Sequence, residues 1–292
     1  MTAALPSRAV LVRRRPARPT EAAEIAACAA QCLLLEVETY PKPGLVSHVD
    51  AGSHADMDAA TFRDSAAAIT PHLEDLAEAG ATGCGMSRLR IIGLEAEAAM
   101  RAATSGVNTH RGAIFGLGLL CAAAGARAAR RTHPTLPLGE IVARLWSDGI
   151  VDGPTLLRSH GSMARLRFGA GGARMEAAFG FPSVYRIGLP TLRRGRRAAP
   201  ADAEAARVEA CFALIAAVED TNLLHRGGPD GLLFAQAAAQ RFLDAGGVGA
   251  SGWRDRAKAI HESFVARRLS PGGSADLLAM TLFVDLQERT IP

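Results

Sequence analysis

The chain has 292 residues, of which 49% are hydrophobic and only 5% aromatic, so its core is expected to consist of Ala, Leu, Val and Ile. Its net charge of +4 permits attraction to anionic small molecules but is too small to indicate nucleic acid as a partner. No apolar run is long enough for a membrane span, and no apolar secretion core is present near the start. Five cysteines without a Cys-x-x-Cys pair indicate free thiols and a cytoplasmic location.

Helical periodicity dominates from residue 21 onward, and no segment alternates with the period of a strand. Helices are predicted over 21–38, 58–78, 87–104, 110–131, 138–148, 154–168, 201–218, 230–245, 253–268 and 274–287. The segment 169–200, rich in Gly, Arg and Pro, is expected to form short helices and a long loop, with the arginine run 193–197 solvated. The prediction is therefore an all-α, single globular domain of about ten helices over 21–292, following a disordered basic tail over 1–20.

The loop over 39–58 is the most polar interruption of this helical pattern. Lys42 is one of only two lysines in the chain, and the prolines on both sides of it stiffen the segment that presents its ammonium group. Ser53 and His54 can donate hydrogen bonds to phosphate oxygens, and Asp56 is the kind of ligand that magnesium prefers. Asp58 is interpreted as the N-cap of the following helix.

Further polar clusters lie at the ends of predicted helices, where free N–H groups attract phosphate. The clusters cover 108–112, 174–183, 219–228 and 270–276. Thr109 has a helix cap as its alternative role, and Asp276 either binds metal or interacts favourably with the helix dipole. The candidate ligands are Asn108, Thr109, His110, Arg111, Arg174, Asn222 and Arg226 for phosphate, and Asp220 and Asp276 for metal.

The common nucleotide-binding signatures are absent. The sequence contains no Walker-type Gly-x-x-x-x-Gly-Lys and no Gly-x-Gly-x-x-Gly after a strand. It also lacks the His-Glu-x-x-His and Gly-x-Ser-x-Gly motifs of metalloproteases and α/β-hydrolases. A chain that carries phosphate ligands without these signatures is expected to use a less common fold.

Taken together, the clusters resemble the triphosphoribosyl-dephospho-CoA synthase family, whose members serve citrate lyase and malonate decarboxylase. The resemblance spans nearly the whole chain and rests on six motifs: Pro41-Lys-Pro-Gly-Leu-Val46, Gly52-Ser-His-Ala-Asp-Met57, Val107-Asn-Thr-His-Arg-Gly-Ala-Ile114, Gly172-Ala-Arg-Met-Glu-Ala177 with Gly180-Phe-Pro-Ser183, Asp220-Thr-Asn222 and Ser270-Pro-Gly-Gly-Ser-Ala-Asp276. Arg111, where a lysine is expected in citrate-lyase members, favours the malonate decarboxylase branch.

The resemblance implies that ATP and 3′-dephospho-CoA give 2′-(5″-triphosphoribosyl)-3′-dephospho-CoA and adenine, a precursor for an acyl-carrier subunit. The 2′-hydroxyl would attack C1 of the ATP ribose through an oxocarbenium-like state. Glu36 is the first candidate for general base, with a solvent-facing helix glutamate as the alternative, and Glu176 is the second candidate. Mg²⁺ is the expected cofactor, and a homodimer is left open. Lys42, His54, Arg111 and Arg226 would hold the phosphates, and Asp56, Asp220 and Asp276 the magnesium.

Two other functions use the same residues. A magnesium-dependent hydrolase of ADP-ribose-type glycosidic bonds would use water as the nucleophile. A non-catalytic nucleotide-binding regulator would bind ATP and leave adenine attached. The products formed from ATP separate all three hypotheses.

Overall fold

A computed structural model of the protein describes residues 20–154 and 172–289, and every regular element within these ranges is helical. This confirms the all-α prediction. The tail over 1–20 and the helix expected over 154–168 fall almost entirely outside the described residues. The helices are α1 (Glu21–Val37), α2 (Ala59–Thr82), α3 (Met86–Ala103), α4 (Arg111–Ala128), α5 (Leu138–Val151), α7 (Gly172–Ala178), α8 (Leu189–Ala198), α9 (Ala203–Ala217), α10 (Thr221–Asp244), α11 (Trp253–Ala266) and α12 (Gly272–Glu288), with short turns η1 (Val184–Gly188) and η2 (Gly247–Gly249).

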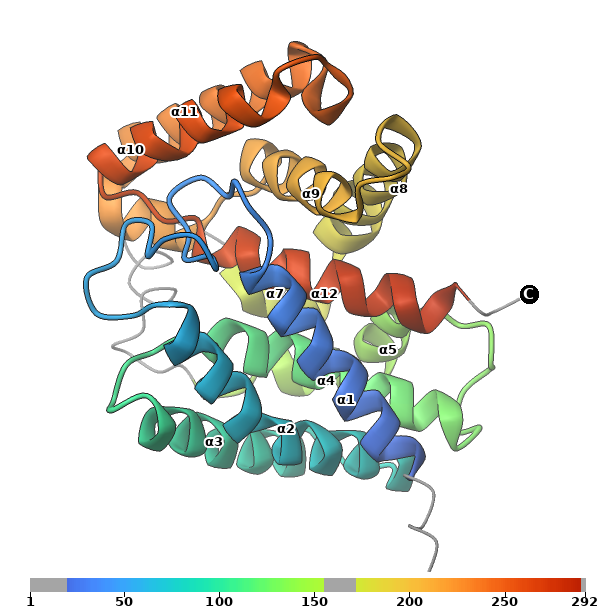
Figure 1. The fold of residues 1–292 in the computed structure, drawn as a ribbon. Helices are drawn as coiled ribbons and strands as arrows, with labels where there is room; N and C mark the ends of the chain where they lie inside the picture. The colour runs from blue at the N-terminus through green and yellow to red at the C-terminus, as the bar shows by residue number, and fades with distance from the viewer. Residues whose placement is uncertain (1–19, 155–171, 290–292) are drawn as a thin grey trace, which may run out of the picture.

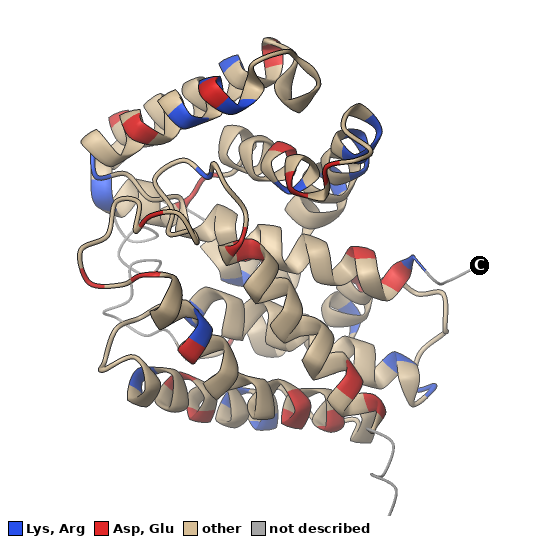
Figure 2. Ribbon diagram, in the orientation of Figure 1, with Lys and Arg blue, Asp and Glu red and all other residues tan. Residues whose placement is uncertain are grey.

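The core is built around α4, which is buried along most of its length. Helices α1, α2, α3, α5 and α12 contact it, and α1 and α12, far apart in sequence, run side by side across the molecule (Figure 1). Helix α9 is almost as buried and packs against α8, α10 and α12. Charged residues lie mostly on outer helices such as α8 and α11 (Figure 2). None of the helices in the described part of the chain is long and apolar enough to span a membrane.

Glycines allow α2 and α4 to pack with their backbones in contact. A Cβ at Gly80 would lie 1.9 Å from the carbonyl oxygen of Ala122, and one at Gly125 would lie 1.9 Å from that of Ala77. Such distances are sterically forbidden, so neither position accepts a side chain unless the helices move apart. Helix α2 therefore continues through Gly80, beyond the end predicted at residue 78, because Gly80 packs against α4. It stops at Gly83, a left-handed residue with φ 78°.

We expect Gly125→Ala to destabilise the protein by about 3 kcal/mol or more, since the new methyl group meets backbone rather than a movable side chain. Gly93→Ala is the matched control, because nothing lies within 4 Å of the Cβ that it adds on α3. That change should stabilise the helix by about 0.5–1 kcal/mol. Urea unfolding of both variants checks the prediction, and equal midpoints for the two would contradict it.

Two predicted segments differ from the structure. The span of α10 consists of two helices joined at a kink: Asp220 caps a first helix from Thr221 that was not predicted, and the non-helical Gly228 (φ 62°) separates it from the second, which matches the helix predicted from residue 230. The described part of the segment 169–200, from Gly172 onward, is mostly helical, and the arginine run, predicted as a solvated loop, lies on α8. Arg194 and Arg196 pair with the buried carboxylates of Glu209 and Asp285, at 2.8 and 2.7 Å. Those two buried acids, distant in sequence, are the reason that the prediction for the arginine run was wrong.

Candidate active site

The polar clusters predicted from the sequence, apart from that over 174–183, meet where the C-terminal end of α1 approaches the N-terminal ends of α4, α10 and α12. The loop over 38–58 lies over this junction (Figure 1). Asp220, the N-cap of α10, binds the first turn of α12, and Asp276 of α12 lies against the first turn of α4. Residues as far apart in the sequence as Glu36 and Asp276, 240 positions, therefore share one site.

The centre of the site is a buried ion pair between Lys42 and Glu36. Lys42 has no solvent exposure and Glu36 is 5% exposed, which rules out the alternative of a solvent-facing glutamate. Burial raises the pKa of Glu36, and the Lys42 ammonium group opposes that shift. A carboxylate whose pKa is raised by burial is a stronger base than one in water, as a general base requires.

The loop that carries Lys42 is clamped onto α11 and the segment after it. His261 places Nδ1 2.7 Å from the Lys42 carbonyl oxygen, and Ser53 donates its hydroxyl to the Leu269 carbonyl at 2.6 Å. Gly44 has φ 66°, and a Cβ there would lie 2.0 Å from the Leu269 carbonyl oxygen. These contacts fix the backbone at Lys42 against α11. The Ser53 hydroxyl, predicted to bind phosphate, instead holds the loop to the Leu269 carbonyl.

Asp220 joins α10 to α12 by accepting four hydrogen bonds. Its Oδ1 accepts from the backbone N–H groups of Asn222 and Leu223, and its Oδ2 accepts from the backbone and hydroxyl of Ser274. Burial raises the pKa of Asp220, and these four donors oppose the rise. Each carboxylate oxygen of Asp220 accepts two hydrogen bonds. These bonds hold the ends of α10 and α12 together and stabilise the negative charge of Asp220.

Asp276 is the carboxyl group with the most perturbed environment in the site. Its pKa is raised well above the ordinary range, first by burial and then by the charges of Glu36 and Asp220. A Cβ at position 112 would lie 2.0 Å from Asp276 Oδ2, so Gly112 is required for the carboxyl group to reach the N-terminal end of α4. The Ala113 N–H group partly offsets the shift. The arrangement favours a carboxyl group that holds its proton.

Basic groups border this acidic centre. Arg226 donates to the carbonyl oxygens of Ser53 and Arg268 and lies 3.2 Å from His54 Nδ1. His54 Nε2 lies 2.9 Å from the Ser270 hydroxyl, just before α12. Burial lowers the pKa of His54, and the nearby Arg226 charge lowers it further. Arg226 is the exposed cation of this rim, which is the position a phosphate ligand needs.

The cluster over 108–111 divides its residues between the surface and the interior. Arg111 pairs with Glu97 at 3.2 Å, and Asn108 accepts the Arg111 N–H at 3.3 Å. Thr109 does not cap α4, because its hydroxyl donates to Ser65 instead. His110 is the N-cap residue and is buried at 3% exposure. Burial, together with the Lys42 charge, lowers the pKa of His110 to about 3.

Other predicted ligands make contacts elsewhere. Arg174 donates to the carbonyl oxygens of Gly153 and Pro154 at 2.7 and 2.8 Å. Glu176 accepts from the backbone and hydroxyl of Ser183 at 2.7 and 3.0 Å, which holds its own segment together. Asn222 lies in the first turn of α10, and a Cβ at Gly272 would lie 3.0 Å from its Nδ2.

The three residues predicted to bind magnesium do not form one ligand set. Within the described ranges, no group of three or more His, Cys, Asp and Glu side chains has a metal-binding arrangement. Asp56 is 63% exposed and lies 3.7 Å from His54, whereas Asp220 is buried and its oxygens are occupied. These three aspartates therefore do not fit a magnesium ion held by the protein.

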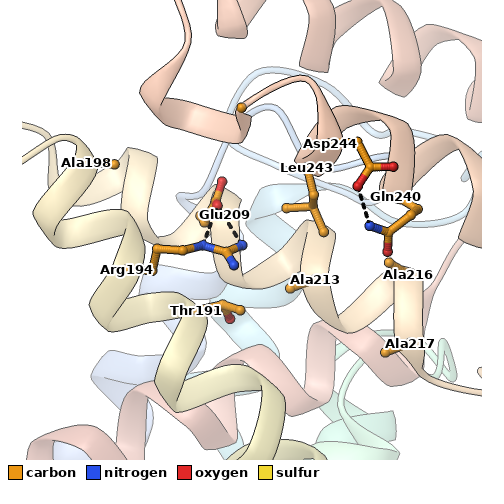
Figure 3. A pocket seen from close by; sticks show the side chains of 11 residues that line it. Thr191, Arg194, Ala198, Glu209, Ala213, Ala216, Ala217, Gln240, Leu243 and Asp244 are labelled. Carbon is orange, nitrogen blue, oxygen red and sulfur yellow. Dashed lines mark hydrogen bonds and ion pairs between the residues drawn. The ribbon is translucent and has the colours of Figure 1, made fainter.

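Two cavities lie beside the site rather than in it. The larger, about 500 Å³, lies between α8, α9 and the end of α10 (Figure 3). Its polar side chains pair with one another, Arg194 with Glu209 and Gln240 with Asp244. The charges of Lys42 and Glu36 affect the pKa of Cys211. Cys211 is two residues from Glu209, so it lies on a different face of α9 from that cavity-lining residue. The second, about 440 Å³, lies between the loop and α11.

Three serines of the site were not predicted. Ser274 and Ser270 lie within a motif whose aspartate was chosen instead, and Ser65 lies in the middle of α2. All three are buried. The sequence offered one signal for Ser65: it is a polar residue at a position of the predicted helix that faces the core.

A desolvated lysine and three carboxyl groups, bordered by arginine and histidine, define an acid–base enzyme that handles a phosphate-bearing substrate. The comparisons with known proteins specify the class. The chain belongs to the family described as ATP:dephospho-CoA triphosphoribosyl transferase, which it matches over residues 22–291. It is a transferase of the triphosphoribosyl-dephospho-CoA synthase type.

Individual relatives agree over most of their length. The chain is 41% identical over 268 residues to a probable 2-(5″-triphosphoribosyl)-3′-dephosphocoenzyme-A synthase of Pseudomonas paraeruginosa, covering 89% of each chain. It is 41% identical over 277 residues to a protein of that name from Azotobacter vinelandii, covering 93% of this chain and 94% of the relative. It is 42% identical over 264 residues to the 2-(5″-triphosphoribosyl)-3′-dephosphocoenzyme-A synthase of Pectobacterium atrosepticum, covering 86% and 85%. No solved structure matches the chain.

Proposed function

We propose that this enzyme transfers the 5-triphosphoribosyl group of ATP to the 2′-hydroxyl of 3′-dephospho-CoA and releases adenine. The observation that carries the proposal is the buried Glu36–Lys42 pair with Asp276 close enough for their charges to interact. Displacement at a ribose C1 passes through a cationic, oxocarbenium-like state, which buried carboxylates stabilise. The reaction also needs one group to accept a proton and another to donate one.

Glu36 and Asp276 divide these proton transfers. Glu36 accepts the proton of the attacking 2′-hydroxyl while the bond between C1 and the adenine nitrogen breaks. Asp276, which holds its proton, donates it to the departing adenine, and the new C1–O bond completes the transfer. One proton is taken up and one is released, so passing the proton from Glu36 to Asp276 resets the site. Lys42 keeps Glu36 oriented, and Asp220 adds a fixed negative charge near C1. The exposed Arg226, with the half-buried His54 beside it, holds the triphosphate.

Incubation of the purified protein with ATP and dephospho-CoA should release adenine in equal amount to the transferred product, which chromatography with mass detection measures. Adenine with free triphosphoribose, independent of dephospho-CoA, would instead support the hydrolase. Unchanged ATP that nonetheless protects the protein against heat would support the regulator. Arg226→Ala should raise KM for ATP about tenfold or more, since one charge-assisted phosphate contact contributes about 1.5–3 kcal/mol.

We also propose that magnesium enters on the triphosphate as part of the substrate, because the residues predicted to hold it do not converge. The same assay with EDTA tests this requirement. Asp56, exposed at the rim next to His54, is the one predicted magnesium ligand with access to such an ion.

The proposed biological role is to make the prosthetic-group precursor for the acyl-carrier subunit of malonate decarboxylase, on the strength of Arg111 in the Asn-Thr-His-Arg motif. Loss of growth on malonate, but not on citrate, after deletion of the gene would support this branch. The five free cysteines agree with the proposed cytoplasmic location. A homodimer remains a proposal that sedimentation of the purified protein can test.

A further inference from the structure

The hydrogen-bonding groups around His110 form a short chain that ends in the site. Thr109 donates its hydroxyl proton to Ser65 Oγ at 2.7 Å, and Ser65 Oγ lies 2.7 Å from His110 Nδ1. With the Thr109 proton directed to Ser65 Oγ, the Ser65 hydroxyl can direct its own proton to Nδ1, and Nδ1 is then the acceptor of this pair. The proton of the neutral ring is thereby assigned to Nε2.

The ring is held in place on its other sides. The Phe62 ring meets it edge to face, with centroids 4.9 Å apart and planes at 83°, and its backbone N–H group points to Met100 Sδ at 3.2 Å. His110 is 3% exposed and Ser65 is fully buried, so the ring is shielded from bulk solvent. The low pKa of His110, about 3, keeps the ring neutral at physiological pH.

His110 Nε2 has no hydrogen-bond partner among the described residues, although it is fully buried. A buried donor without a partner costs about 1–3 kcal/mol, so a fold that orients it this firmly has a use for it. His110 is the N-cap of α4, two residues before Gly112, where a Cβ would lie 2.0 Å from Asp276 Oδ2, so the ring belongs to the end of α4 that borders the site. The cations that suit phosphate lie instead on the exposed rim, at Arg226.

We infer that the Nε2–H group of His110 donates a hydrogen bond to the ribose–purine end of ATP, and that Ser65 and Thr109 are positioning residues that fix this tautomer. The identity of the ligand rests on the proposed function. This role differs from the phosphate-binding role predicted for His110 and Thr109 from the sequence, because a neutral, buried donor suits an uncharged ring or hydroxyl better than a triphosphate.

Nitrogen-15 NMR of the imidazole reads the tautomer without any need for catalysis. The spectrum should show His110 protonated on Nε2, and adenosine, but not tripolyphosphate, should shift its signals. Ser65→Ala should remove the tautomer preference. A ring protonated on Nδ1, or an equal response to tripolyphosphate, would overturn the inference. Because the spectrum is recorded without dephospho-CoA, no transfer takes place, and this result is separate from the outcome of the transfer assay.

Kinetics supply the second arm. Ser65→Ala should lower kcat/KM for ATP about tenfold, the measure of one neutral hydrogen bond, with inhibition by tripolyphosphate unchanged. His110→Gln, which keeps an N–H donor at similar reach, should retain more activity than His110→Leu. Ser263→Ala, a serine on α11 bonded only to a backbone carbonyl, is the matched control and should act as wild type. Equal losses in His110→Gln and His110→Leu, or weaker tripolyphosphate inhibition in Ser65→Ala, would overturn the assignment.

Discussion

Replacing Lys42 with Met should lower the free energy of unfolding by about 3–5 kcal/mol and abolish transfer activity. The stability loss follows because the change leaves the Glu36 carboxylate buried without its counter-charge. The activity loss follows because an unpaired, buried Glu36 takes up a proton and can no longer accept one from the 2′-hydroxyl. Urea unfolding and adenine release measure the two effects.

The double variant Glu36→Gln with Lys42→Met separates these effects. Removal of both charges should restore most of the stability, since buried ion pairs are often replaceable by neutral groups at little cost, while activity stays absent. Lys258→Met is the matched control, because the only other lysine is exposed on α11 and lies 3.9 Å from Glu262. It should change neither property. Activity in the double variant would remove Glu36 from the mechanism.

Asp276→Asn should make the protein more stable and almost inactive. The pKa of Asp276 is raised in the folded state, so the folded protein binds this proton more tightly than the unfolded chain does. The stabilisation from that proton is complete below the unfolded pKa of about 3.9 and is lost as the pH rises through the folded pKa. Asparagine keeps the shape and the acceptor for Ala113 without this loss.

The melting temperature of Asp276→Asn should therefore exceed that of wild type at neutral pH, with a difference that grows from about pH 4 upward. Adenine release should fall about 10²–10⁴-fold, the usual contribution of a general acid. Asp58→Asn, at the exposed N-cap of α2, keeps its cap and should leave activity intact. A less stable but fully active Asp276→Asn would contradict both the raised pKa and the role assigned to this carboxyl group.

The sequence predicted the fold well where helices are long and end in clear signals. Asp58 caps α2 as expected, with Thr61 completing a reciprocal capping box. The site was harder to predict, because a motif identifies polar residues without saying which of their atoms remain free. Asp220 and Ser53 carry the expected residue types, yet their oxygens are used in joining segments. Only packing distinguishes such a residue from Asp276, whose pKa is raised first by burial and then by the charges of neighbours 56 and 240 residues away.

The side-by-side packing of α1 and α12 has a consequence for how this enzyme is made. During synthesis, α1 leaves the ribosome long before its partner exists, and the ion pair near its end has no Asp276 beside it until α12 has been translated. The nascent chain must keep the apolar faces of α1 and α4 protected until α12 has been translated. In the proposed mechanism, a chain that stops before α12 therefore lacks the proton donor for adenine.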